Sequence, residues 1–223
     1  MRVVKSSYVI AFFALAVSLF LAVQYFVAGD AKSADFVQQK LKEMSLSDFW
    51  YVVLYVHIVG SIAAMVVGWS QFIRKWRAKS RGLHKAIGKI YAAGVLLGGL
   101  SGIYLAFYAS GGPVATAGFL LLAIAWLYTM LRGVKAIVTN GDRTAHRRWM
   151  MRSYALTFAA VMLRIYVPIC MMIFGNDAFN DYYRIIAWLC WVPNLIFVEW
   201  LIRRRTANLS RRLDSSSRST TAS

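Results

Sequence analysis

Residues 144–168 read TAHRRWMMRSYALTFAAVMLRIYVP, a basic start with one histidine followed by an almost wholly apolar run. Polar side chains recur through this run at intervals of three and four, which places them on one face of a helix. That face consists of His146, Met150, Ser153, Thr157, Ala160 and Arg164. An arginine inside an apolar span is costly and by default faces protein or a water-filled cavity. The pattern predicts a membrane helix with a functional polar stripe.

The whole chain has the composition of an integral membrane protein. Hydrophobic residues make up 59% and charged residues 16% of its 223 residues, and the mean hydropathy is +0.53. Five further apolar runs accompany the quoted one, at residues 8–28, 49–73, 88–108, 115–130 and 185–202. The sequence predicts an all-α, polytopic membrane bundle of six transmembrane helices. The first run is longer than a secretory signal core, so we expect a retained helix.

The distribution of charge predicts the orientation in the membrane. Of the 26 Lys and Arg residues, 21 lie in both termini and in the connections after the second and fourth spans, and four lie on the other side. By the positive-inside rule both termini are cytoplasmic, in a bacterial inner (plasma) membrane with anionic lipids at its cytoplasmic face. The net charge of +17 is split into short clusters between spans, which argues against nucleic acid as a partner.

Three regions follow from these patterns. Residues 1–48 hold the first helix and an outer polar loop, in which residues 36–44 have the spacing of a short surface helix. Residues 49–203 form a five-helix core, and residues 204–223 are a basic, serine- and threonine-rich tail expected to be disordered. We expect Pro168 to bend the fifth span, and the spans show no pair of broken helices typical of transporters.

Small residues predict close helix contacts in the core. Gly94, Gly98 and Gly102 form a GxxxGxxxG pattern, and a stripe on the second span joins a histidine to further small residues. The stripe comprises His57, Gly60, Ser61, Ala64, Gly68 and Gln71. Cys170 and Cys190 lie in apolar runs and fit no metal or disulfide spacing, so we interpret them as packing thiols and expect no metal site.

The segments at His84-Lys-Ala-Ile-Gly-Lys and His146-Arg-Arg-Trp-Met-Met-Arg carry a resemblance. With Gly99-Leu-Ser-Gly-Ile-Tyr-Leu-Ala, Ser153-Tyr-Ala-Leu-Thr-Phe-Ala-Ala, Arg164 and Glu199-Trp, the chain resembles domain-of-unknown-function family 2306, bacterial predicted membrane proteins. The resemblance covers about residues 50–203. It implies the multi-spanning architecture and marks these residues, but it names no reaction, and whether the protein is an enzyme stays open.

A redox function is the first hypothesis. A b-type haem needs two imidazoles at one depth on facing helices, each held by a further group. His84 and His146 are the histidine pair at matched depth, near the cytoplasmic face, with Arg147 and Arg152 beside them to hold propionates. Two haems would need four histidines, and the chain has three. The cofactor would therefore be a single haem b, or a quinone at the same place, and a membrane redox partner or a second copy would accompany it.

The alternative is proton-coupled transport or handling of a small anionic substrate. Arg164 and His57 fall at similar depths in the outer half, where an arginine binds carboxylate or phosphate and a histidine relays a proton. Ser153 and Thr157 would connect this site to the basic inner end. Glu199 lies near the inner face, and we expect it to pair with Arg147 or Arg152.

A structural or assembly factor is the third class. The inner histidines and arginines would then bond lipid phosphates, and His57 would bond the backbone of a neighbouring helix.

Overall fold

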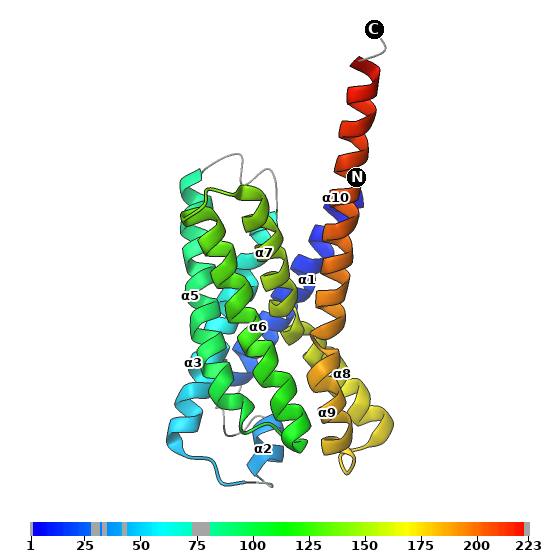
Figure 1. Ribbon diagram of the computed structural model, residues 1–223. Helices are drawn as coiled ribbons and strands as arrows, with labels where there is room; N and C mark the ends of the chain where they lie inside the picture. The colour runs from blue at the N-terminus through cyan, green and yellow to red at the C-terminus, as the bar shows by residue number, and fades with distance from the viewer. Residues whose placement is uncertain (1, 28–31, 33–34, 42–43, 73–80, 221–223) are drawn as a thin grey trace.

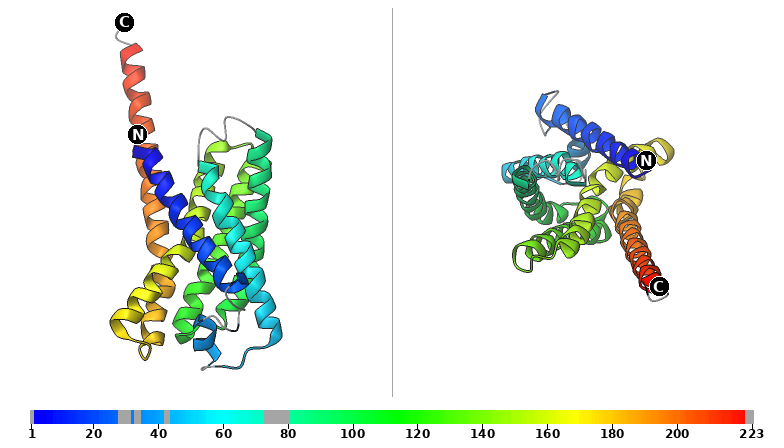
Figure 2. Two further views of the ribbon diagram at one scale, coloured as in Figure 1. Left: turned by 180° about the vertical axis from the view of Figure 1, so that it is seen from behind. Right: turned by 90° about the horizontal axis from the view of Figure 1, so that it is seen from above.

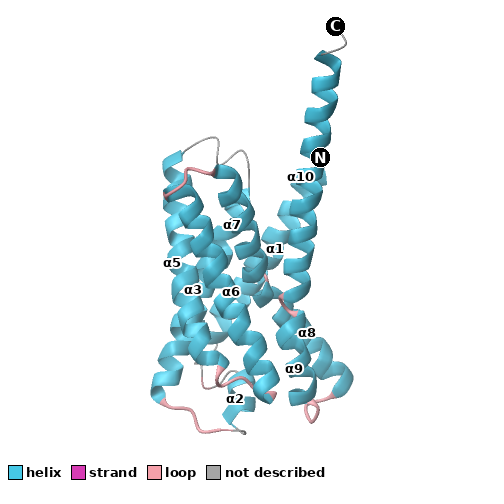
Figure 3. Ribbon diagram, viewed as in Figure 1, coloured by secondary structure: helices cyan, strands magenta, loops and turns pink. Residues whose placement is uncertain are grey.

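A computed structural model describes residues 2–27, 32, 35–41, 44–72 and 81–220 (Figure 1). These residues form helices joined by loops, with no strand among them (Figure 3). Six segments are long and apolar enough to cross a membrane: Tyr8–Val27, Asp48–Gly68, Gly82–Ala106, Gly112–Val138, Arg143–Phe174 and Phe179–Asn208. The predicted all-α bundle with six membrane spans is confirmed, although the last span begins earlier than the expected residue 185.

The first span and the outer loop lie against the core. Helix α1, Arg2–Ala22, continues as a π-helical turn at Val23–Val27. Helix α2, Asp35–Leu41, falls within the segment predicted to form a short helix. Val37 and Lys40 of α2 are buried, and the Lys40 ammonium donates to the Tyr108 carbonyl. This helix is therefore packed onto the end of the bundle.

Helices α3, Asp48–Gly68, and α5, Arg81–Ala106, touch backbone to backbone. A methyl group added to Gly60 would lie 2.7 Å from the Gly98 amide nitrogen and 2.9 Å from the Gly94 carbonyl oxygen. Only glycine permits this approach, as the small-residue stripes predicted. A 3-10 turn at Trp69–Phe72 follows α3.

Helices α6, Gly112–Val138, and α7, Arg143–Thr157, form a second close pair. The turn before α6 needs two left-handed glycines, Gly111 with φ 88° and Gly112 with φ 72°. Asp142 caps α7 by accepting from the amides of Thr144 and Ala145. The two pairs face each other as a four-helix bundle (Figure 2). Its core includes Tyr91, Val95, Trp126, Met130 and Tyr154.

Two of the six spans have a short interruption in their helix, of one residue in the fifth and two in the sixth. The fifth span breaks at Phe158, between α7 and α8, Ala159–Phe174. The sixth breaks at Cys190 and Trp191, between α9, Phe179–Leu189, and α10, Val192–Thr220. Pro193 explains the second break, because proline has no N–H and its ring clashes with the carbonyl four residues earlier.

Two expectations concerned these spans. Helix α8 continues through Pro168, and the bend expected there stays a prediction. Each span continues in helical conformation through its short interruption, and one side chain serves both interruptions. Asn194 Nδ2 donates to the carbonyl oxygens of Cys190 at 2.9 Å and Ala155 at 3.4 Å. An amide at this point satisfies carbonyls at both interruptions, where water is scarce.

The two ends of the chain lie at the same end of the molecule (Figure 1). Helix α10 extends beyond the other helices and runs to Thr220, through the tail that we expected to be disordered.

Candidate functional site

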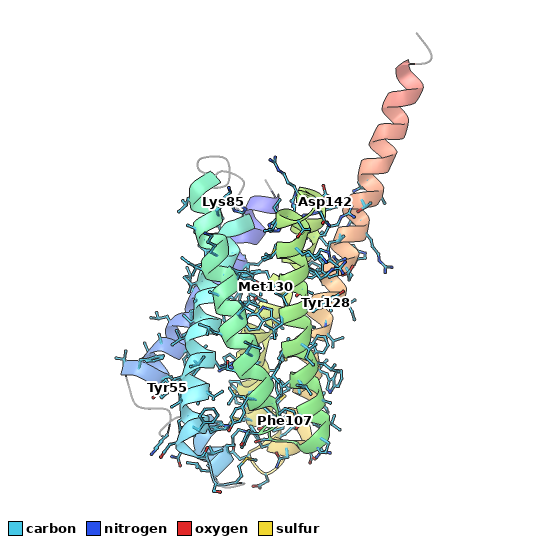
Figure 4. The ribbon with its side chains drawn as sticks, turned by 60° about the vertical axis from the view of Figure 1, so that its left-hand side comes forward. Tyr55, Lys85, Phe107, Tyr128, Met130 and Asp142 are labelled. Carbon is cyan, nitrogen blue, oxygen red and sulfur yellow. The ribbon has the colours of Figure 1, made fainter. Side chains whose placement is uncertain are left out.

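His84 and His146 lie at one depth, at the end of the bundle where the chain also begins and ends. Helices α5 and α7 run in the same direction, and the Tyr91 and Ser153 hydroxyls meet at 2.7 Å between them. His84 precedes Tyr91 by seven residues, and His146 precedes Ser153 by seven residues. Seven residues are about two helical turns, or about 10 Å. Both histidines therefore lie at about one depth on α5 and α7, two turns from this contact, and Figure 4 shows the neighbouring Lys85 and Asp142 at this end.

Backbone contact fixes the ring of His146. Its Nδ1 lies 2.7 Å from the Gly133 carbonyl oxygen of α6. A carbonyl only accepts, so Nδ1 carries the hydrogen and the neutral ring keeps its lone pair on Nε2. This is the arrangement found for metal-binding histidines in general. His84 is half-buried, and one turn further on, a methyl group added to Gly88 would meet no described atom within 4 Å.

The arginines at this end have different surroundings. Arg152 forms a two-point ion pair with Glu199, with Nη2 3.0 Å from Oε2, and its guanidinium lies 4.6 Å from the Trp149 ring. The expected pairing of Glu199 with a nearby arginine is confirmed. Arg147 is exposed. Of the two arginines proposed to hold a cofactor, Arg152 is engaged with Glu199, and Arg147 faces the surroundings of the protein.

Hydroxyl groups fill the middle of the bundle. The Tyr91 hydroxyl also lies 3.0 Å from Thr157 Oγ1, which accepts from Trp126 Nε1 at 2.9 Å. Thr157 Oγ1 donates to the Ser153 carbonyl at 3.1 Å, and both Ser153 and Thr157 are buried. Every hydroxyl in this group has a partner within it. Ser153 and Thr157 thus bond to Tyr91 and Trp126, two residues that the sequence reasoning did not select.

His57 contacts the backbone of α5 at Gly98. His57 Nδ1 lies 2.8 Å from the Gly98 carbonyl oxygen and 3.4 Å from Ser101 Oγ. This confirms a backbone contact for His57, and again leaves the lone pair of the neutral ring on Nε2. Arg164 is half-buried in the middle of α8. The similar depth expected for His57 and Arg164 stays a prediction.

Two polar residues that matter in this half were not selected from the sequence. Asn194 joins the two helix breaks, and the hydroxyl of Ser18 on α1 is buried with no hydrogen-bond partner in the described part of the chain. Ser18 stood out only as one of two polar residues in the first apolar run. No spacing rule connects it with residues on other helices.

Comparison with known proteins identifies the family. The model of domain-of-unknown-function family 2306, described as predicted membrane protein, matches residues 54–202. The chain belongs to this family. The matched region begins in α3 and continues into α10. It therefore contains the His84 and His146 site as well as His57 and Arg164. No curated protein and no solved structure matches the chain.

Proposed function

We propose that this family 2306 protein binds a single b-type haem between His84 and His146 and carries electrons within the membrane. The observation that supports the proposal is the register of α5 and α7, in which His84 and His146 each precede the Tyr91–Ser153 contact by about two turns and so share one depth. When bound, a haem iron with two imidazole ligands supplies one-electron chemistry.

The surroundings fit such a group. The Gly133 carbonyl orients His146 with Nε2 available, and Gly88 leaves room beside His84. Each close helix pair is drawn together by glycine, at Gly60 with Gly94 in one pair and at Gly133 in the other. Arg147 and Lys85, both exposed at this end, supply positive charge for two propionates.

An absorption spectrum of the purified protein, oxidised and then reduced, tests the proposal. Expressed with haem available, the protein should show a Soret band that both His84→Ala and His146→Ala abolish. His57→Ala is the matched control and should retain the band. Gly88→Leu should weaken haem binding by filling the space beside His84. A colourless protein would exclude haem, and a quinone recovered from it by extraction, but lost in both variants, would assign the site to a quinone instead.

Anion transport is a second candidate, favoured by the short helix interruptions in the fifth and sixth spans, which Asn194 connects. Discontinuous helices are a common feature of transporter binding sites. His57 and Arg164 would form the substrate site, with Ser153, Thr157 and Glu199 on the inner side. Anion uptake into proteoliposomes that Arg164→Gln abolishes would support this candidate, and absence of uptake for every anion tried would exclude it.

The basic end supports a cytoplasmic position for both termini in a bacterial inner membrane. We propose anionic lipid headgroups as the partners of its exposed arginines.

A further inference from the structure

Two arginines lie around the ring of Trp149, at the basic end of the bundle. The Arg152 guanidinium lies 4.6 Å from the centre of this ring, and the Arg132 guanidinium lies 5.2 Å from it. Arg132 belongs to α6, whereas Trp149 and Arg152 belong to α7, so the contact joins two helices. Two like charges beside one ring repel each other, and an anion bound there would relieve the repulsion.

Glu199 neutralises one of the two arginines. Both of its carboxylate oxygens accept from Arg152. Arg132 contacts aromatic rings, but among the described residues it makes no hydrogen bond and no ion pair. Lys135, three residues further along α6, also has no partner in the described part of the chain. Residues three apart are neighbours on a helix surface, so α6 presents two unpaired positive charges side by side.

Arg132, Lys135 and Trp149 form a surface that a ligand can reach, which we name the Trp149 patch. Arg132 and Lys135 are exposed, and Trp149 is partly exposed. The Trp149 indole N–H makes no hydrogen bond to any described residue, and an indole nitrogen only donates. The patch therefore offers two cations and one neutral donor, which suit the oxygens of a phosphate group.

An apolar strip continues from the patch along the same face of α6. Leu121, Ile124 and Tyr128 precede Arg132 at intervals of three and four residues, and they are 45%, 47% and 51% exposed. Leu121 lies eleven residues before Arg132, or about 16 Å along the helix, and one leaflet of the hydrocarbon core is about 15 Å thick. An acyl chain whose headgroup lies at the patch would therefore run along this strip.

We propose that one anionic glycerophospholipid, of the phosphatidylglycerol kind, binds at the Trp149 patch. Arg132 and Lys135 bind its phosphate, and the Trp149 N–H donates to a phosphate or ester oxygen. An acyl chain covers Leu121 and Ile124. The inference rests on the proposed contact of this end with anionic lipid, and it deepens that contact by assigning one lipid to one place. It requires neither haem nor transport.

Native mass spectrometry of the purified full-length protein in detergent, with lipid added, tests the proposal by counting the lipid molecules that stay bound. The probes are phosphatidylglycerol and phosphatidylcholine with the same acyl chains. Both carry the phosphate, but the choline ammonium is repelled by the two cations of the patch. The first phosphatidylglycerol should bind about tenfold more tightly than phosphatidylcholine. Equal affinities for the two lipids would overturn the proposal.

Variants of Arg132 locate the binding. Arg132→Gln should weaken binding of the first phosphatidylglycerol about tenfold, the value of a hydrogen bond to a charged group. Arg132→Lys keeps the charge but loses the planar fork, so its affinity should be intermediate. Arg204→Gln is the matched control, because Arg204 is also exposed and lies 5.1 Å from the Trp200 ring. Full affinity in Arg132→Gln would refute the proposal.

Trp149→Phe tests the neutral donor separately. It keeps an aromatic face beside the arginines and removes the N–H, so phosphatidylglycerol binding should weaken about fivefold. Unchanged affinity would remove Trp149 from the site. Melting temperatures provide a second readout, since phosphatidylglycerol should raise the melting temperature of the unchanged protein more than that of Arg132→Gln. Equal shifts would count against the site.

The two arginine variants also distinguish a single site from a general attraction of lipid to the basic end. Equal losses in Arg132→Gln and Arg204→Gln would exclude the single site and leave the general contact with anionic lipid in place. No phosphatidylglycerol retained by the unchanged protein would exclude both. A loss confined to Arg132→Gln is the result we expect.

Discussion

Arg152 and Glu199 form a two-point ion pair that joins α7 to α10, with Nη2 3.0 Å from Oε2. Both side chains are partly exposed, at 19% and 33%, which limits the contribution of the pair. The Arg152 guanidinium lies over the ring of Trp149. The Trp149 ring also contacts Arg132 and Tyr128 of α6. The ion pair therefore connects the last helix to both members of the α6–α7 pair.

Glu199→Gln should lower the free energy of unfolding by about 1 kcal/mol, because a charged acceptor is lost in a partly buried pair. The charge swap Arg152→Glu with Glu199→Arg should recover most of that loss. Thermal unfolding in detergent measures both effects, with Arg203→Gln at an exposed position as the control. A swap no more stable than the two single variants combined would show that the two residues do not interact.

Gly60→Ala should destabilise the protein by about 1–3 kcal/mol through overpacking, since the new methyl group would meet backbone atoms of α5 at 2.7 and 2.9 Å. Gly88→Ala, on α5 itself, meets no described atom and should be neutral or stabilising by up to about 1 kcal/mol. Melting temperatures of the two variants provide the comparison. Equal effects would contradict the backbone contact between α3 and α5.

Tyr91→Phe should cost about 1–2 kcal/mol, because Ser153 and Thr157 would each lose a buried hydrogen-bond partner. Tyr128→Phe removes the same atom at an exposed site and should have little effect. Chemical unfolding followed by tryptophan fluorescence measures the free energy of unfolding of both variants. Equal values for Tyr91→Phe and Tyr128→Phe would show that the Tyr91 hydroxyl bonds to neither Ser153 nor Thr157.

Asn194→Leu should lower stability by about 1 kcal/mol, since the amide bonds the Ala155 and Cys190 carbonyls at the two helix breaks. Hydrogen exchange should rise near residues 158 and 190 and stay unchanged in α3 and α5. Pro168→Ala is the contrasting change and should not weaken the fold, because the fifth span does not break there. Faster exchange throughout the bundle would mean that Asn194 has no local role.

The predicted orientation can be measured with single cysteines in a background where Cys170 and Cys190 are replaced. A cysteine at Asn140, on the basic side, should react with a membrane-impermeant maleimide only after the cells are permeabilised. A cysteine at Ser45, on the opposite side, should react in intact cells. The reverse pattern would place both termini outside the cytoplasm.

The six spans could be predicted because apolar length is a local property of the sequence. The contact between α3 and α5 could also be anticipated, since small residues at four-residue spacing have few other uses in an apolar helix. The pairing of Glu199 followed from its level in the membrane and the excess of arginine there. These inferences depend on how far a residue lies from the ends of its own span, and this distance can be read directly from the sequence.

The helix breaks and the residues around Arg164 could not be predicted in this way. Phe158 has no feature that marks a break, and Pro168, which has one, lies inside a continuous helix. Asn194 and Ser18 gain their importance from helices distant in the sequence. A single sequence gives no information about such lateral neighbours, so the candidate site could be predicted only in part.

The hydroxyls of Tyr91, Ser153 and Thr157 have a consequence for ion leakage. They bond to one another and to Trp126. These hydroxyls are therefore not available to hold a chain of water molecules between the level of His57 and the level of His84 and His146. Protons and small ions crossing at this height would have to displace hydrogen bonds that are already made. We therefore expect the centre of the four-helix bundle to be a poor path for protons and small ions.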